Sequence, residues 1–220
     1  MSGVKKQPVI VLDGPAGAGK SSIGREAACR LGLPFLDTGA IYRAITFFML
    51  RDGIAAAESP ELAERLREFT VSFRNGTVFA CGEDVTEAIR SPGIDKKVSS
   101  YSALPMVREF LLGIQRDAIA GGLVAEGRDM GTVVFPDADV KIFLTAAPET
   151  RARRRYDERI ARGESVDYGE ILEQVNRRDT LDRSRDVAPL KPALDAVVLD
   201  TTDLSFDEVL ENVLEYAARL

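Results

Sequence analysis

A glycine-rich turn between a strand pattern and a helix pattern constrains this chain more than any other feature. Residues 8–13 form a short apolar run typical of a buried parallel strand, and apolar residues recur at helical spacing over residues 23–31. Between them, the segment Gly14–Ser21 has the spacing G-x-x-x-x-G-K-S of a phosphate-binding P-loop. A strand, a loop and a helix in this order predict an α/β domain with a parallel sheet.

The chemistry of this loop favours a bound nucleoside triphosphate. Its glycines allow backbone N–H groups to turn inward, and the following helix adds the positive end of its dipole. We expect Lys20 to reach the β- and γ-phosphates and the Ser21 hydroxyl to ligate Mg²⁺. The predicted nucleotide-binding residues are Gly14, Pro15, Ala16, Gly17, Ala18, Gly19, Lys20, Ser21 and Ser22. A glycine-rich turn that holds no ligand is the alternative interpretation.

Composition narrows the range of functions. The 220 residues suffice for one well-buried α/β domain, and a net charge of −6 disfavours nucleic acid or anionic lipid as a partner. No uncharged apolar run is long enough to span a membrane. Because Cys29 and Cys81 suggest no disulfide framework, we expect a cytoplasmic protein. The chain lacks histidine, which excludes Ser-His-Asp and Cys-His catalysis but leaves phosphoryl transfer open.

The rest of the chain continues the alternation, with one interruption. Strand patterns alternate with helix patterns at residues 35–37, 40–51, 105–118, 123–125, 140–144 and 196–200. Ser205 and Glu208 form a capping box before a closing helix. The stretch 61–103 instead contains a helix pattern and then Asn75-Gly76 between alternating β-formers, which predicts a hairpin. We interpret this stretch as an insertion.

Two arginine-rich segments follow the strand pattern at residues 140–144. Their charged side chains recur at helical spacing, at positions 151, 155, 159 and 162 in the first segment and 178, 182 and 185 in the second. One interpretation is a pair of solvated helix faces. The other, which the P-loop favours, is a mobile lid whose guanidinium groups bind phosphate oxygens and exclude water.

The P-loop alone does not identify the reaction. A GTPase needs an N-K-x-D segment to read guanine, and the nearest match, residues 176–179, lacks the lysine. A motor or transporter ATPase would end a hydrophobic strand in Asp or Asp-Glu, whereas strand 123–125 continues into Glu126-Gly127-Arg128-Asp129. We expect these residues at the carboxyl edge of the sheet, where α/β proteins bind ligands.

Three segments resemble the signature segments of the bacterial cytidylate kinase family: DTGAIYR at 37–43, EGRDMGTVVFP at 126–136 and RDVAPL at 185–190. The resemblance extends from the first strand to the last helix. Thr38 stands where many members have serine, and Ser21-Ser22 stands where some have Gly-Thr.

The resemblance implies one domain over residues 1–220 with a three-layer P-loop NTPase fold around a central parallel sheet. Its core would cover about 1–60 and 104–220. An NMP-binding insertion with a small antiparallel sheet would cover about 61–103, and a helical lid about 151–166.

The family's activity implies ATP-dependent, Mg²⁺-assisted phosphorylation of CMP and dCMP. By resemblance, Arg43, Arg128 and Arg185 would hold the CMP phosphate, Asp182 with Arg178 would contact the sugar, and Ser99, Arg108 and Asp129 would read the base. Thr38 and Tyr42 would complete the acceptor site. The implied catalytic residues are Lys20, Arg128, Arg154, Arg155 and Arg185, with Arg154 and Arg155 on the lid.

Hydrogen-bond chemistry supports the assignment of the base. Arg108 can only donate, which suits N3 and O2 of cytosine, and an ionised Asp129 can only accept, which suits the N4 amine. A structural ion pair between these two residues is the alternative. We expect in-line phosphoryl transfer without a general base, by a monomer acting on small molecules. A UMP- or shikimate-type kinase, a GTPase and an RNA-binding protein are the competing functions.

Overall fold

The computed structural model describes residues 7–74, 76–118 and 121–219. The chain divides into two units, Asp37–Asp117, here called the hairpin unit, and Met1–Leu36 with Ala118–Leu220, here called the sheet unit. The boundaries 61–103 for an inserted NMP-binding subdomain and 151–166 for a lid remain predictions.

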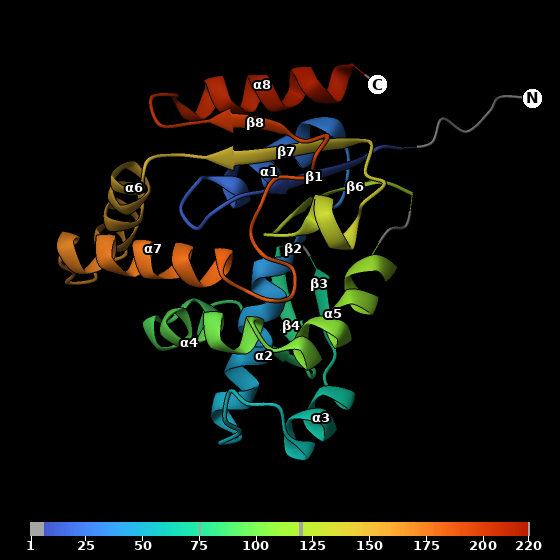
Figure 1. The fold of residues 1–220 in the computed structure, drawn as a ribbon, viewed down its shortest axis with the longest axis vertical. Helices are drawn as coiled ribbons and strands as arrows, with labels where there is room; N and C mark the ends of the chain where they lie inside the picture. Colours follow the sequence, from blue (N-terminus) through green and yellow to red (C-terminus); the bar gives the residue numbers. More distant parts are fainter. Residues whose placement is uncertain (1–6, 75, 119–120, 220) are drawn as a thin grey trace, which may run out of the picture. The chain divides into compact units, whose positions relative to one another are not determined.

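Five short strands form the sheet unit's centre (Figure 1). They are β1 (Val9–Asp13), β2 (Phe35–Asp37), β6 (Leu123–Glu126), β7 (Val140–Thr145) and β8 (Val197–Asp200), in the order β2-β6-β1-β7-β8. Strand β1 pairs in parallel with β6 and β7, and β7 pairs in parallel with β8. The predicted parallel α/β sheet is confirmed, and its central strand is buried on both faces, as its unbroken apolar sequence indicates.

One face of this sheet is covered by α1 (Lys20–Leu31) and α8 (Phe206–Ala218). Ile23 and Ala27 of α1 and Val213 of α8 share a core cluster with strand residues such as Ile10. Helix α1 ends where predicted, at Gly32 with φ 66°, and the predicted capping box of α8 is confirmed.

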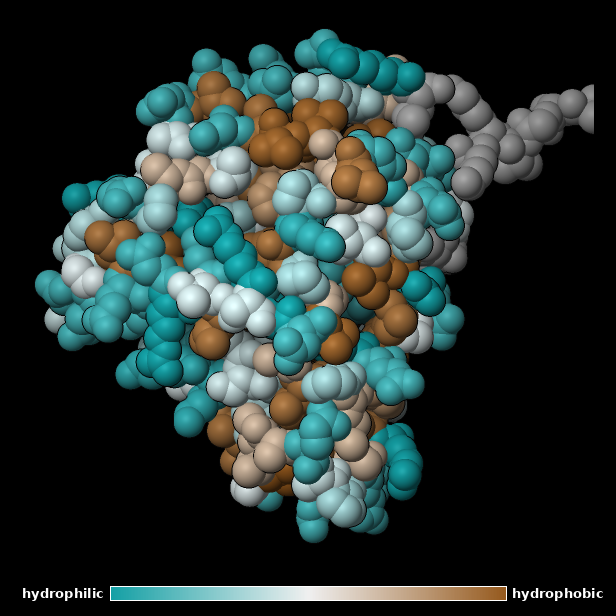
Figure 2. Space-filling view, viewed as in Figure 1, coloured by the Kyte–Doolittle hydropathy of each residue, from teal (hydrophilic) through white to brown (hydrophobic). Residues whose placement is uncertain are grey.

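Two helices follow β7: α6 (Pro148–Ala161) and α7 (Tyr168–Arg183). They pack against each other through Ala152, Ile171 and Val175, and their visible face is mainly hydrophilic (Figure 2). The interpretation of this arginine-rich face as fully solvated is wrong at Arg151, which is only 1% exposed. Its guanidinium group bonds inside the sheet unit instead of facing water.

A π-helix, η2 (Met130–Val134), lies between β6 and β7 and begins immediately after Asp129. The sequence analysis did not predict it. Short π-helical segments are rare, and those that do occur are often found at functional sites.

The hairpin unit contains the predicted antiparallel pair, β3 (Val71–Arg74) with β4 (Thr77–Ala80). Asn75 of the predicted turn lies outside the described residues. The unit's other elements are α2 (Thr38–Arg51), α3 (Pro60–Arg67), β5 (Glu83–Asp84), the 3₁₀ turn η1 (Ala88–Arg90), α4 (Pro92–Ser102) and α5 (Pro105–Asp117). Strand β5 extends the hairpin to three strands. None of the helices in the described ranges is long and apolar enough to cross a membrane.

Candidate functional site

The predicted P-loop connects β1 to α1 and has the backbone that its glycines permit. Gly14, Gly17 and Gly19 have φ values of 143°, 80° and 88°. A Cβ atom on Gly14 would lie 1.9 Å from the carbonyl oxygen of Leu144, so only glycine fits there. Gly19 caps α1 without a side-chain hydrogen bond, and the first turn of α1 has no acidic residue. The positive end of this helix is therefore available to an anion.

Lys20 is the first residue of α1 and is 4% exposed. Its ammonium group donates to the carbonyl oxygen of Pro15 at 2.8 Å. Burial, and next the charge of Arg128, lower the pKa of Lys20 to about 7, and Arg178 acts in the same direction. Lys20 therefore lies in the field of Arg128, which follows β6, and of Arg178 on α7, while the carboxylates of Glu126 and Asp13 act in the opposite direction.

The loop's donor set fits a magnesium ion bound together with nucleotide phosphates. Ser21 is an exposed residue in the first turn of α1. Within the described ranges, no group of three or more His, Cys, Asp or Glu side chains could hold a metal ion. Mg²⁺ commonly takes one or two protein oxygens and completes its shell with phosphate oxygens and water. A single hydroxyl beside the phosphate loop is consistent with that mode.

Asp13 ends β1 and accepts two backbone hydrogen bonds across the sheet edge. Its carboxylate oxygens accept from the amides of Met130 and Gly131, each at 2.8 Å. Burial raises the pKa of Asp13 to about 6, although both hydrogen bonds act in the opposite direction. Asp13 thus fixes the start of η2, which directly follows Arg128 and Asp129.

Asp182 of α7 is fully buried, and its carboxylate lies beside three other predicted site residues, all arginines. Nε of Arg128 lies 3.1 Å from Oδ2 of Asp182, Nε of Arg178 lies 3.8 Å from the same oxygen, and Arg185 pairs with Oδ1. Burial is the largest influence on the pKa of Asp182 and raises it, but the three arginine charges together hold it below its ordinary value. Three cations around one anion leave a net positive cluster suited to a phosphate.

The two arginines expected on the lid lie on α6. Arg154 donates from Nη2 to the carbonyl oxygen of Thr201 at 2.6 Å and from Nη1 to its hydroxyl at 3.0 Å. Arg155, the next residue, is half-buried. In this arrangement Arg154 joins α6 to the turn after β8, and its role toward phosphate remains a prediction.

The hairpin unit holds the other predicted acceptor residues. Arg108 of α5 is 7% exposed, donates to the carbonyl oxygen of Ser102 at 3.1 Å and lies 5.6 Å from the ring centre of Tyr42. Arg43 of α2 pairs with Asp95 of α4 at 2.6 Å. Thr38 is buried at the start of α2, and Ser99 is half-buried on α4. Asp129 belongs to the sheet unit, where it is 2% exposed.

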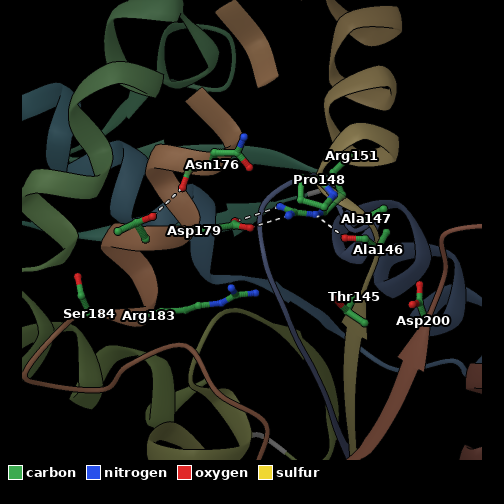
Figure 3. Close-up of a pocket in the computed structure, with 11 residues that line it drawn as sticks. Thr145, Ala146, Ala147, Pro148, Arg151, Asn176, Asp179, Arg183, Ser184 and Asp200 are labelled. Carbon is green, nitrogen blue, oxygen red and sulfur yellow. Dashed lines mark hydrogen bonds and ion pairs between the residues drawn. The ribbon is translucent and has the colours of Figure 1, made fainter. Parts of the chain in front are cut away.

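The sequence analysis missed a buried pair, Arg151 of α6 with Asp179 of α7. Asp179 entered the sequence analysis only as the last letter of the rejected N-K-x-D match. The pair lines a cavity of about 770 Å³ beside the ends of β7 and β8 (Figure 3). Two opposite charges on separate helices, 28 positions apart, give no local sequence signal of their contact.

The chain matches one protein family over almost its whole length. A family model described as cytidylate kinase matches residues 10–219. The cytidylate kinase of Caldanaerobacter subterraneus subsp. tengcongensis is 48% identical to this chain, over 94% of this chain and 92% of that protein. The cytidylate kinase of Desulfitobacterium hafniense is 46% identical, over 96% of this chain and 93% of that protein. A solved structure of an uncharacterized Eubacterium ventriosum protein matches with a TM-score of 0.53, 13% identity and coverage of 98% of this chain and 100% of that one, which supports the fold alone.

Proposed function

Because this chain belongs to the cytidylate kinase family, we propose that it transfers the γ-phosphoryl group of ATP to the phosphate of CMP, forming ADP and CDP. The observation that carries the proposal is electrostatic. Arg128 and Arg178, which surround Asp182, also lower the pKa of Lys20 on the P-loop. One connected positive field is what two polyanionic substrates need when they are brought end to end.

The proposed chemistry needs positioning and charge more than a proton acceptor. The attacking oxygen of CMP is already ionised near neutral pH, which suits a chain without histidine. Lys20 would bind the donor phosphates, while Arg128 and Arg185 would hold the acceptor phosphate and compensate charge as it shifts toward ADP. Arg154 and Arg155 would contribute from α6 when the site excludes water. Arg178 and Asp182 would contact the sugar.

The base and remaining acceptor contacts are proposed from the family pattern. Arg108 would donate to cytosine, Asp129 would accept from its N4 amine, and Ser99 would support them. Arg43 would bind the CMP phosphate, with Thr38 and Tyr42 beside the nucleotide. Uracil exchanges the donor and acceptor positions, so two mismatched buried pairs at about 1–3 kcal/mol each would reject UMP by roughly one to four powers of ten. The same contacts would admit dCMP.

We also propose Mg²⁺ as a cofactor, held by the Ser21 hydroxyl together with ATP phosphates. When bound, this ion would neutralise phosphate charge and order the triphosphate. The proposed setting is a monomer in the cytoplasm, without a nucleic-acid or membrane partner. The net charge of −6 and the two free cysteines support that setting.

The test is a coupled assay of ADP release with Mg-ATP and one of five acceptors: CMP, dCMP, UMP, AMP or shikimate. We expect CMP and dCMP to be the preferred acceptors. Rapid phosphorylation of UMP or shikimate with CMP left unchanged would favour another small-acceptor kinase and would contradict the proposal.

A further inference from the structure

The guanidinium group of Arg151 makes four hydrogen bonds inside the sheet unit. It forms two parallel bonds to Asp179, with Nη1 3.0 Å from Oδ1 and Nη2 2.5 Å from Oδ2 (Figure 3). Nε donates to the carbonyl oxygen of Ala146 at 2.9 Å, and Nη1 also donates to the carbonyl oxygen of Ala16 at 3.1 Å. Ala16 belongs to the P-loop, so one buried side chain joins α6, α7 and the donor-phosphate loop.

The contact with Ala16 fixes the orientation of a P-loop peptide. A trans peptide is rigid, so its carbonyl and its N–H group point in opposite directions. With the carbonyl of Ala16 directed at Arg151, the N–H of Gly17 is directed away from Arg151. A side chain at Gly17 would be crowded, because a Cβ atom there would lie 3.0 Å from both Cβ and the carbonyl oxygen of Arg151, and the φ of 80° favours glycine. Arg151 therefore packs against this peptide as well as bonding to it.

The other partner of Arg151 lies on the helix that carries the arginine cluster. Asp179 precedes Asp182 by three positions on α7, which is one helical turn. Helix α7 is thus linked to the P-loop through Asp179 and Arg151, and to the segment after β6 through Asp182 and Arg128.

We propose that Arg151 and Asp179 are positioning residues that hold the Ala16–Gly17 peptide of the P-loop in fixed geometry relative to the Asp182 arginine cluster. The proposal rests on the kinase function above, in which the loop binds the donor phosphates and the cluster binds the acceptor phosphate. In-line transfer is sensitive to such geometry, since displacements of about 1 Å can reduce a rate about 100-fold.

Stability alone is a weak reason for this pair. A buried ion pair seldom stabilises a fold more than apolar side chains of similar size, because both charges lose their hydration. Helices α6 and α7 already have an apolar contact through Ala152, Ile171 and Val175. A positioning role therefore predicts that activity and stability respond differently to substitution.

The first test compares Arg151→Lys with Val175→Ala. Lysine keeps a charge opposite Asp179, but one ammonium group cannot reproduce the planar fork that also reaches Ala16. We expect kcat to fall about 10- to 100-fold, with KM for both nucleotides close to wild type. Val175→Ala removes apolar contact between the same helices, so it should lower the melting temperature and leave kcat unchanged.

The second test is the double variant Arg151→Met/Asp179→Leu, which removes both charges together and should fold even if a single variant does not. We expect a melting temperature near that of wild type and a kcat as low as that of Arg151→Lys. Recovery of wild-type kcat in this stable variant would overturn the proposal. Failure of the kinase function would appear differently, because wild type itself would then leave CMP unchanged.

Discussion

Lys20 is almost completely buried, and this burial lowers the pKa of its amine. Its ammonium group donates to the carbonyl oxygen of Pro15. Besides burial, the charges of Arg128 and Arg178 lower its pKa, while those of Glu126 and Asp13 act in the opposite direction. Phosphate oxygens would add negative charge beside the amine and raise its pKa. We therefore expect the amine of Lys20 to take up a proton when the loop binds ATP.

We predict that ATP binding takes up close to one proton at about pH 8.5 and very few at about pH 6. The pKa of Lys20 is about 7 in the free protein, so the amine is mostly neutral at the higher pH, and bound phosphates restore its charge. Calorimetric titration in buffers of different ionisation enthalpy measures this uptake. Lys20→Arg, which stays charged at both pH values, is the control and should take up no proton. Equal uptake by the control would contradict the prediction.

At the residue scale, local pattern predicts some site residues and leaves others unseen. The spacing of the loop predicts Lys20 and Ser21 as site residues, and the position of Arg128 after a buried strand predicts it as another. Arg178, Asp182 and Arg185 follow from helical spacing, although spacing alone does not show that Arg128 joins them. Arg151 and Asp179 give no such signal, because their meaning depends on a contact between two helices.

At the scale of elements, the end of β1 and the start of η2 form one unit through Asp13. The two hydrogen bonds that it accepts from backbone amides hold the first residues of the π-helix, and η2 directly follows Arg128 and Asp129. The charged form of this carboxylate is unfavourable, because burial raises its pKa more than the two hydrogen bonds lower it.

We predict that the stability advantage of wild type over Asp13→Asn falls as pH rises from about 4 to about 6. The pKa of Asp13 is raised to about 6 in the fold from an ordinary 3.8, so the folded chain binds more protons at this site within that range. Its contribution is fully present below the unfolded pKa and is lost as pH rises through the folded pKa. The change should reach about 3 kcal/mol at most.

Denaturant unfolding of both proteins at several pH values measures this difference. Asparagine does not titrate, so other ionisable groups cancel between the two proteins. A difference that stays flat, or that grows with pH, would show that Asp13 is not a buried, charge-disfavoured group.

Elements with strong local signals were predicted well. The apolar run of β1, the Gly32 stop of α1, the capping box of α8 and the β3–β4 hairpin all depend on near neighbours in sequence. The π-helix η2 was not predicted, because its start depends on Asp13, 117 positions before Met130.

At the scale of the whole molecule, the proposed site residues divide between two units. The hairpin unit holds Thr38, Tyr42, Arg43, Ser99 and Arg108, and the sheet unit holds the P-loop and the Asp182 cluster. Alternating strand and helix patterns predicted the parallel sheet but not the strand order β2-β6-β1-β7-β8. Strand order depends on which distant strands pair, and short apolar strands resemble one another too closely to specify this locally.

The central claim is that the γ-phosphoryl group passes directly from ATP to CMP on this protein, and tracing that group tests it. Purified protein is incubated with magnesium, CMP and ATP labelled in the γ-phosphoryl group, and the labelled products are separated. We predict one labelled CDP for each ADP formed, with no labelled inorganic phosphate. Label released as inorganic phosphate, with CMP left unlabelled, would contradict the account.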